Sequence, residues 1–169
     1  MFGPKFLALG TVLATDIGPL KLVDGPFSGG EGHGYKAQAV KGGSFHFVKV
    51  FYGPDELMGK PSGMSEKQFV RHVKERQEKI VSANLGSVSP HFAAPSAMVT
   101  ERGIVGVVSK WVQLPSSLGN FHRQGGDYLS RLGFLRAFAG EMARLHASGT
   151  AHGDLNEENI VLDPTNLAD

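Results

Sequence analysis

The sequence predicts an α+β protein in which an antiparallel sheet with one helix precedes the beginning of a helical region. Residues 5 to 52 contain short runs of β-branched and aromatic residues separated by glycine-rich turns, a pattern typical of neighbouring strands. Apolar residues then recur at helical spacing after Ser65 and again after Asp127. These observations indicate a small sheet lobe followed by helices.

Composition narrows the class of protein. The 169 residues are 41% hydrophobic and 20% charged, which fits one soluble globular unit or a small two-lobed protein. The net charge of +1 provides no overall field that favours nucleic acid or an anionic membrane. The sequence has no cysteine, so disulfides and zinc thiolates are excluded, and we expect a protein of a reducing, cytoplasmic compartment.

The N-terminus contains an apolar run that could form a secretory signal or an opening strand. Phe6 to Ala14 is short and is interrupted by Gly10 and Thr11, which favours an opening strand over a secretory signal. No stretch of the sequence approaches the length of a membrane-spanning helix.

Strands are predicted on both sides of a glycine-rich segment. Leu20 to Val23, Tyr35 to Val40 and Phe45 to Phe51 have the alternation or the residue types of strands. Between the first two, Gly25 to Gly34 is expected to form a flexible loop whose backbone N–H groups can approach phosphate oxygens closely. Lys49 lies inside the last strand, where a lysine either extends from an edge or has a buried anionic partner.

A helix is predicted after a polar insertion at residues 53 to 64. Ser65 and Gln68 have the spacing of a capping box, and Phe69, Val73 and Ile80 recur on one helical face. The charged residues of this segment form a solvated face or supply a partner for the strand lysine.

Two more strands and a second helix follow. The strands are Ala97 to Thr100 and Ile104 to Val112, joined by a turn at residues 101 to 103. After a loop rich in Pro, Ser and Gly, Asp127 can cap a helix that ends before Gly149. The apolar residues at helical spacing are Leu129, Leu132, Leu135, Phe138, Met142 and Leu145.

A polar loop and a short apolar run come next. The loop contains His152, Asp154 and Asn159, and Ile160 to Leu162 is suited to a strand. The aspartate could orient an attacking hydroxyl while the asparagine oxygen binds a magnesium ion on phosphates. Alternatively, Asp154 and Asn159 only make turn hydrogen bonds.

This loop and strand resemble the H-x-D-x-x-x-x-N catalytic loop of the protein-kinase-like superfamily. Upstream, Phe27-x-Gly29-x-x-Gly32 followed by Lys49 resembles the glycine-rich loop and the strand lysine of the same superfamily. The stretch GGEGHGYKA is similar to the GGEG-x-VY variant of some bacterial kinase-like domains. The resemblance implies a kinase-like fold, with an N-lobe at residues 1–112 and the start of a C-lobe at residues 113–169.

Three residues depart from the superfamily pattern. Phe27 replaces the first glycine, Gly34 stands where a valine usually covers the adenine, and Phe47 occupies the place of the usual alanine. The changes at 34 and 47 could compensate each other, because a lost side chain on one strand makes room for a ring on the next. Alternatively, Phe47 fills the adenine pocket and nucleotide binding is lost.

The resemblance implies ATP and Mg²⁺ as ligands and assigns roles to individual residues. Lys49 would position the phosphates and Glu78 would hold Lys49, with Glu75 and Glu66 as alternative partners. Asp154 would orient the nucleophile and Asn159 would bind magnesium. The remaining implied contacts are Gly29, Gly30 and Gly32 over the phosphates and the backbone of Lys110, Trp111 and Val112 at the adenine.

The substrate and the completeness of the site stay open. The sequence His152-Gly153-Asp154 is shared with aminoglycoside- and choline-type phosphotransferases, so the receiving hydroxyl belongs to a protein (Ser/Thr) or to a small molecule. Asp163 and Asp169 are not followed by Phe-Gly, so a D-F-G aspartate is missing. We therefore expect a fragment of a longer kinase, or a truncated pseudokinase that acts as an interaction module. In either case a protein partner or a C-terminal region would cover the apolar stripe of the last helix.

Overall fold

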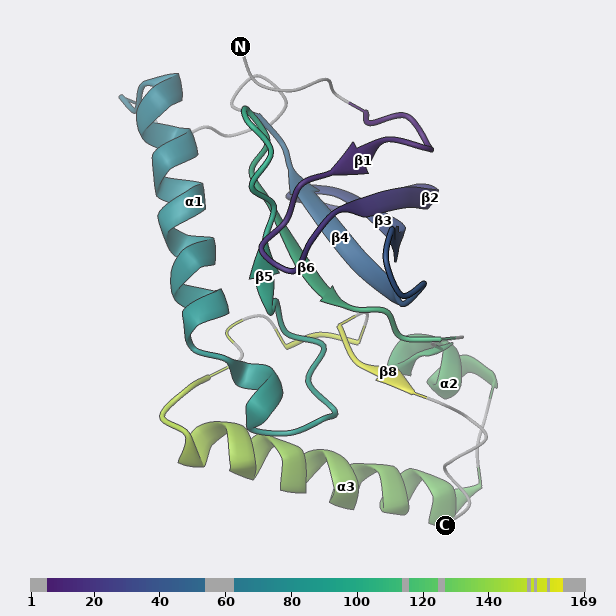
Figure 1. The fold of residues 1–169 in the computed structure, drawn as a ribbon. Helices are drawn as coiled ribbons and strands as arrows, with labels where there is room; N and C mark the ends of the chain where they lie inside the picture. The colour runs from purple at the N-terminus through teal and green to yellow at the C-terminus, as the bar shows by residue number, and fades with distance from the viewer. Residues whose placement is uncertain are drawn as a thin grey trace. The chain divides into compact units, whose positions relative to one another are not determined.

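The computed structural model describes residues 6–53, 63–113, 116–124, 127–151, 153, 155–157 and 159–162. The chain divides into two compact units, which are described separately. The first comprises Met1–Ser87 and Phe92–Trp111, and the second comprises Val88–His91 and Val112–Asp169. A sheet with one long helix in the first unit, and helices in the second, confirm the predicted α+β class (Figure 1).

The first unit is built on a six-stranded sheet with the strand order β1-β2-β3-β4-β6-β5 and antiparallel pairing throughout. β4 lies between β3 and β6, so its backbone is hydrogen-bonded on both sides and its side chains alternate between the two faces of the sheet. The strands are β1 (Val12–Leu13), β2 (Leu20–Ser28), β3 (Gly32–Ala39), β4 (Phe45–Phe51), β5 (Ala97–Met98) and β6 (Gly106–Lys110).

The glycine-rich segment, predicted to be a flexible loop, mostly continues the strands around it. Phe27 pairs with Gly34 and Ser28 pairs with His33, and within this segment residues 29–31 are the ones that belong to neither strand. Register shifts interrupt β2 before Phe27, and Gly25 adopts a φ of +115° that an L side chain rarely adopts. Glycine weakens a strand but does not prevent it from pairing. The glycine-rich composition therefore predicted a loop where strands form.

The hydrophobic core lies on one face of this sheet. Tyr35, Val48 and Val108 are each 0% exposed and lie opposite one another on three neighbouring strands. The Tyr35 hydroxyl accepts a hydrogen bond of 3.0 Å from the backbone N–H of Leu7, which fixes the N-terminal segment over this face. The other members of the core are Leu7, Leu13, Leu20, Leu22, Ala37, Ala97 and Val99. Because side chains alternate along β4, Lys49 points to the opposite face.

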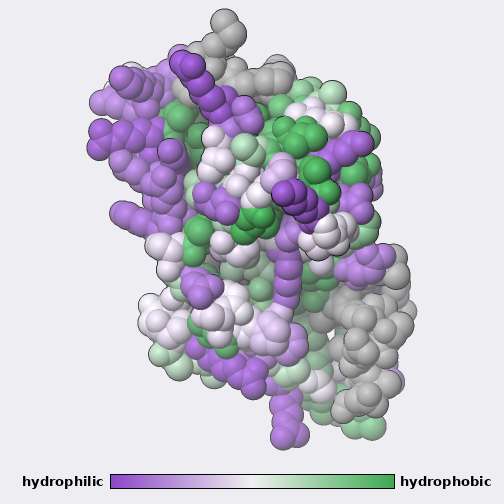
Figure 2. Space-filling view, in the orientation of Figure 1, coloured by the Kyte–Doolittle hydropathy of each residue, from purple (hydrophilic) through white to green (hydrophobic). Residues whose placement is uncertain are grey.

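Helix α1 (Glu66–Ser82) begins at the predicted capping box, in which Ser65 and Gln68 satisfy each other's backbone N–H groups. The helix lies beside β5 (Figure 1) and buries Phe69 and Gln77. Hydrophilic side chains gather over its outer surface (Figure 2). A single turn of 3₁₀ helix, η1 (Leu85–Ser87), follows it.

The second unit contains α2 (Leu118–Gln124), α3 (Tyr128–Ala147) and a short ladder between β7 (Ser116–Ser117) and β8 (Val161–Leu162). Asp127 caps α3 as predicted, since its side chain accepts a hydrogen bond of 2.9 Å from the Ser130 N–H. Gly149, with a φ of +77°, ends the helix.

The apolar residues of α3 are divided between buried and exposed positions. Phe134 and Leu145 are buried, whereas Tyr128 and Leu129 are 73% and 76% exposed. Leu132 and Leu135 are exposed as well. No helix formed by the described residues is long and apolar enough to cross a membrane.

Candidate functional site

The turn between β2 and β3 carries the three predicted glycines, and packing explains only one of them. A Cβ at Gly32 would overlap the carbonyl oxygen of Val50 on β4, so the sheet itself requires glycine there. A Cβ at Gly30 would meet no atom within 4 Å, and one at Gly29 would make only ordinary contact with the Gly32 carbonyl. The open position of Gly30 is therefore consistent with a backbone that a ligand approaches closely.

The turn is held by specific hydrogen bonds. The Gly29 N–H donates to the Gly32 carbonyl at 3.0 Å, and the Tyr52 hydroxyl donates to the Gly29 carbonyl at 3.0 Å. The Tyr52 N–H donates to the carbonyl of Glu31 at 3.0 Å. These contacts fix residues 29–32 against the end of β4, so Glu31 is presented beside the strand lysine.

Lys49 forms an ion pair with Glu31 of this turn. Its Nζ lies 3.2 Å from Glu31 Oε2, while Arg76 of α1 lies 3.0 Å from Glu31 Oε1. The side chains of Lys49, Glu31 and Arg76 are 33%, 52% and 46% exposed, respectively. Partial burial acts to raise the pKa of Glu31, but the hydrogen bonds and charges of Arg76 and Lys49 outweigh it and hold that pKa below its ordinary value.

The predicted pair between Lys49 and Glu78 is not present in this structure. Glu78 pairs with Lys74 at 3.7 Å and Glu75 pairs with Arg71 at 2.7 Å, both along the helix. Glu66 lies in the first turn of α1, far along the helix from the residue that reaches the sheet turn. The reason is the rotation of the helix: Gln77, one residue before Glu78, occupies the buried position.

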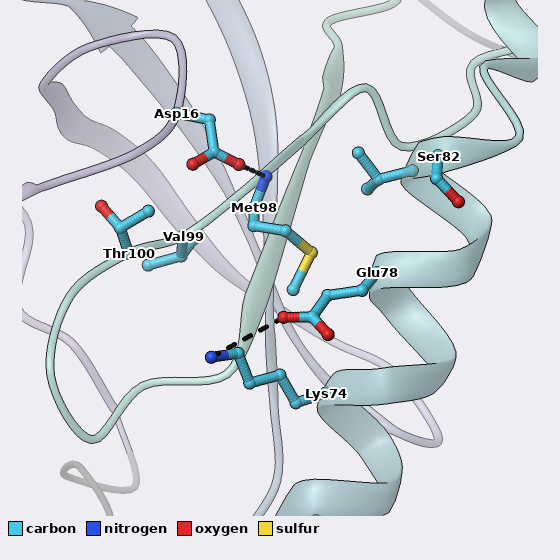
Figure 3. Close-up of a pocket in the computed structure, with 8 residues that line it drawn as sticks. Asp16, Lys74, Glu78, Ser82, Met98, Val99 and Thr100 are labelled. Atoms are coloured by element: carbon cyan, nitrogen blue, oxygen red, sulfur yellow. Dashed lines mark hydrogen bonds and ion pairs between the residues drawn. The ribbon is translucent and has the colours of Figure 1, made fainter.

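Glu78 instead lines a groove of about 410 Å³ between α1 and the β5 region (Figure 3). The close-up shows its carboxylate directed to Lys74 and the Asp16 carboxylate directed to the backbone N–H of Met98, at 2.9 Å. The ionisable side chains of this groove are thus engaged with the protein. It is a different place from the surface around Lys49.

Phe47 and Gly34 fit together, as one of the two sequence-based hypotheses proposed. A Cβ at Gly34 would lie 2.5 Å from Phe47 Cζ and 2.7 Å from its Cε2. The ring therefore occupies the space that a side chain at position 34 would need. Phe47 and Lys49 are two residues apart on β4 and face the same side of the sheet. The backbone partner of Phe47 on β6 is Ser109, which is 7% exposed.

A cluster of aromatic rings and one lysine lies at the end of β6. The Phe27 and Trp111 ring centroids are 6.4 Å apart. Lys36 Nζ lies 4.3 Å from the Phe45 ring centroid and 4.9 Å from that of Trp111. Phe27, which replaces the expected first glycine, thus packs beside the segment predicted to contact adenine. Of that segment, Lys110 and Trp111 belong to the first unit and Val112 to the second.

The predicted catalytic loop lies in the second unit. His152 and Asp154 fall outside the described residues, so their predicted roles stay predictions. Asn159 is described, and its backbone N–H donates to the Asn156 side-chain oxygen at 3.1 Å. The Asn156 side chain therefore shapes the turn before β8. For magnesium the described residues supply Asn159, and they contain no group of three His, Cys, Asp or Glu that could hold a metal ion.

A second polar cluster in this unit was not predicted from the sequence. The Glu141 Oε1 of α3 lies 2.9 Å from His91 Nδ1 and also pairs with Arg144. Hydrogen bonds from the Ser89 hydroxyl and from His91 hold the pKa of Glu141 below its ordinary value. These contacts attach residues 88–91 to α3.

A sheet that carries a glycine turn over a central strand lysine, beside one long helix, defines a protein-kinase-like fold, and comparison with solved structures confirms it. The chain is similar to the kinase domain of Mycobacterium tuberculosis PknI, with a TM-score of 0.66 and 20% identity over 95% of this chain and 60% of that one. A mutant of the same PknI domain matches with a TM-score of 0.66 and 17% identity over 94% of this chain and 59% of that one.

Vaccinia related kinase 3 is also similar, with a TM-score of 0.59 and 20% identity over 95% of this chain and 48% of that one. The chain thus spans 60% or less of the length of these kinase structures. No protein-family model matches the sequence, and no curated protein matches it.

Proposed function

We propose that this chain is the nucleotide-binding part of a kinase-like phosphotransferase that transfers the γ-phosphoryl group of ATP to a Ser or Thr hydroxyl of a protein. The observation that carries the proposal is the position of Lys49. It projects from the doubly paired β4 toward a turn whose Gly30 has open space around it, and its carboxylate partner is a half-exposed residue of that turn.

The roles follow from the chemistry of phosphoryl transfer. Lys49 and the backbone of residues 29–32 would hold the phosphates, and the backbone of residues 110–112 would contact adenine. Asp154 would orient the receiving hydroxyl, and Asn159 would help to hold magnesium. The magnesium ion would neutralise charge on the phosphates. In such a site positioning and charge neutralisation supply most of the catalysis.

Under the same proposal, Lys49 and Glu78 would pair when the nucleotide is bound. Lys49 would have to leave Glu31 to form it, and Glu78 would have to leave Lys74. Both existing pairs are substantially exposed, and exposed pairs contribute only about 0–1 kcal/mol. Breaking these two ion pairs would therefore cost little free energy.

Two other functions remain candidates, each with its own observation. The exposed apolar residues of α3 (Tyr128, Leu129, Leu132 and Leu135) favour a pseudokinase that acts as an interaction module. The His152-Gly153-Asp154 sequence favours transfer to a small-molecule hydroxyl, as in aminoglycoside- or choline-type enzymes. A protein partner or the rest of a kinase C-lobe would cover α3.

A thermal-shift titration with ATP and Mg²⁺ tests nucleotide binding. A ligand at about 100 times its Kd stabilises the folded state by about 2.7 kcal/mol. For a chain of this size that corresponds to a rise in Tm of roughly 5–10 °C. Lys49→Ala should abolish the rise, whereas Lys21→Ala, an exposed lysine of β2, should preserve it.

Absence of any shift in the unmodified chain would contradict the nucleotide-binding proposal. If the shift is present, phosphoryl transfer is assayed next with radiolabelled ATP, against a protein substrate and against small-molecule alcohols. The label found on serine or threonine supports the protein kinase reading, and label on the alcohol alone supports the small-molecule enzyme.

A further inference from the structure

Glu31 occupies a position between two cations that come from distant parts of the first unit. One carboxylate oxygen faces Lys49 on β4 at 3.2 Å, and the other faces Arg76 on α1 at 3.0 Å. Each oxygen of this carboxylate thus accepts from a different cation. A larger anion with more oxygens could accept from the same two donors at this position.

We propose that Lys49 and Arg76 together form the phosphate-binding site of this protein, and that Glu31 is an internal anion which a polyphosphate displaces from it. The inference rests on the proposed function, because it adds Arg76 and Glu31 to the same site. Arg76 is a binding residue in this scheme, since it would contact a phosphate directly.

Displacement of Glu31 is physically easy. All three side chains retain a third or more of their exposure, so water can solvate Glu31 once it leaves. Exposed ion pairs are weak, and a single carboxylate carries less charge than a triphosphate.

The charges predict opposite effects for two substitutions. Glu31→Gln removes a negative charge beside the incoming phosphate and frees both cations, so it should tighten polyphosphate binding by about threefold to thirtyfold at low salt. Arg76→Gln removes one of the two donors and should weaken binding by about threefold to tenfold. A merely structural role of the Glu31 contacts predicts weaker binding, or no change, for both variants.

The chain offers matched controls for each substitution. Arg71 on the same helix pairs with Glu75 at 2.7 Å in a more exposed ion pair that does not include Lys49. Arg71→Gln should leave binding unchanged. Glu101→Gln, which removes an exposed negative charge between β5 and β6, is the control for Glu31→Gln. The Tm of each variant without ligand checks that it folds.

The experiment is calorimetric titration of the full chain and its variants with inorganic tripolyphosphate, and separately with ATP and Mg²⁺. Tighter binding by Glu31→Gln and weaker binding by Arg76→Gln, with both controls unchanged, support the inference. The inference is overturned if Arg76→Gln binds like the unmodified chain, or if Glu31→Gln does not bind more tightly than it.

The outcomes also separate the inference from the proposed function. Binding of ATP that depends on Lys49 but not on Arg76 or Glu31 overturns the inference and leaves the function standing. Binding of tripolyphosphate but not of ATP, with the Glu31 and Arg76 effects present, supports the two-cation site and contradicts the nucleotide function. Absence of binding by the unmodified chain and by Glu31→Gln contradicts both.

Discussion

The contact between Gly34 and Phe47 makes a quantitative prediction about two substitutions. A methyl group at position 34 would lie 2.5 Å from Phe47 Cζ, well inside the distance at which carbon atoms repel. The φ of Gly34 is not in the left-handed region, so alanine is compatible with the backbone there. The clash with the ring is therefore the main obstacle to Gly34→Ala.

The magnitude follows from how the ring can respond. Overpacking costs about 1–3 kcal/mol, and Gly→Ala at a compatible backbone returns about 0.4–1 kcal/mol. Since the ring can relieve the clash only by giving up its packing on the sheet, we expect Gly34→Ala to destabilise the chain by about 1–2 kcal/mol. In a Phe47→Ala background the same change should be neutral or stabilising. The coupling energy between the two sites should thus be about 1–3 kcal/mol.

Urea unfolding of the four proteins of this double-mutant cycle measures the coupling. Gly30→Ala is the matched control, because a Cβ at that position meets nothing within 4 Å. If Gly34→Ala has the same effect with and without the Phe47 ring, the two departures from the superfamily pattern are independent, and the compensation argument is wrong.

Three further predictions concern stability. Gly32→Ala, whose Cβ would overlap the Val50 carbonyl of β4, should cost about 3 kcal/mol or more in urea unfolding, because backbone cannot move aside as a side chain can. Asp127→Ala removes the cap of α3 and should cost about 1 kcal/mol, seen as a Tm lowered by roughly 2–4 °C in circular dichroism; an unchanged Tm would contradict the cap. Glu141 has a folded-state pKa below its ordinary 4.5, so its contribution is fully present above about pH 4.5 and is lost as the pH falls through the lowered pKa. The urea midpoint of Glu141→Gln should therefore decline less with acid than that of the unmodified chain, and parallel acid profiles would refute this.

Local chemistry allowed much of the fold to be predicted. The caps at Ser65 and Asp127 depend on residues three positions away, so their spacing was visible in the sequence. Lys49 was placed on a strand because aromatic and β-branched residues surround it, and the structure places it on β4. The kinase-like fold was predicted from the resemblance of the polar loop at residues 152–159, and of the glycine-rich segment with Lys49, to the motifs of the superfamily.

The partners of Lys49 could not be predicted in the same way. Glu31 lies 18 residues from Lys49 and 45 from Arg76, and these three meet only after the sheet and α1 have packed. Which residue of α1 faces the sheet depends on the rotation of the helix, and the sequence did not reveal that Gln77 rather than Glu78 is buried. One residue turns a helix by about 100°, enough to exchange the buried Gln77 for an exposed glutamate.

The positions of Phe47 and Lys49 on one strand link two questions: whether Lys49 binds phosphates, and whether the Phe47 ring closes the adenine pocket or packs against the base. They are two residues apart and point to the same side, about 7 Å from each other along β4. In the proposed site Lys49 would contact the phosphates, whereas Phe47 occupies the alanine position of the superfamily pattern, beside the proposed adenine pocket. The ratio of the affinities for ATP and for tripolyphosphate therefore isolates the contribution of the base. If the ring closes the adenine pocket, the two ligands bind equally and Phe47→Ala raises the affinity for ATP alone. If the ring is a surface against which the base packs, ATP binds more tightly than tripolyphosphate, and Phe47→Ala removes that advantage.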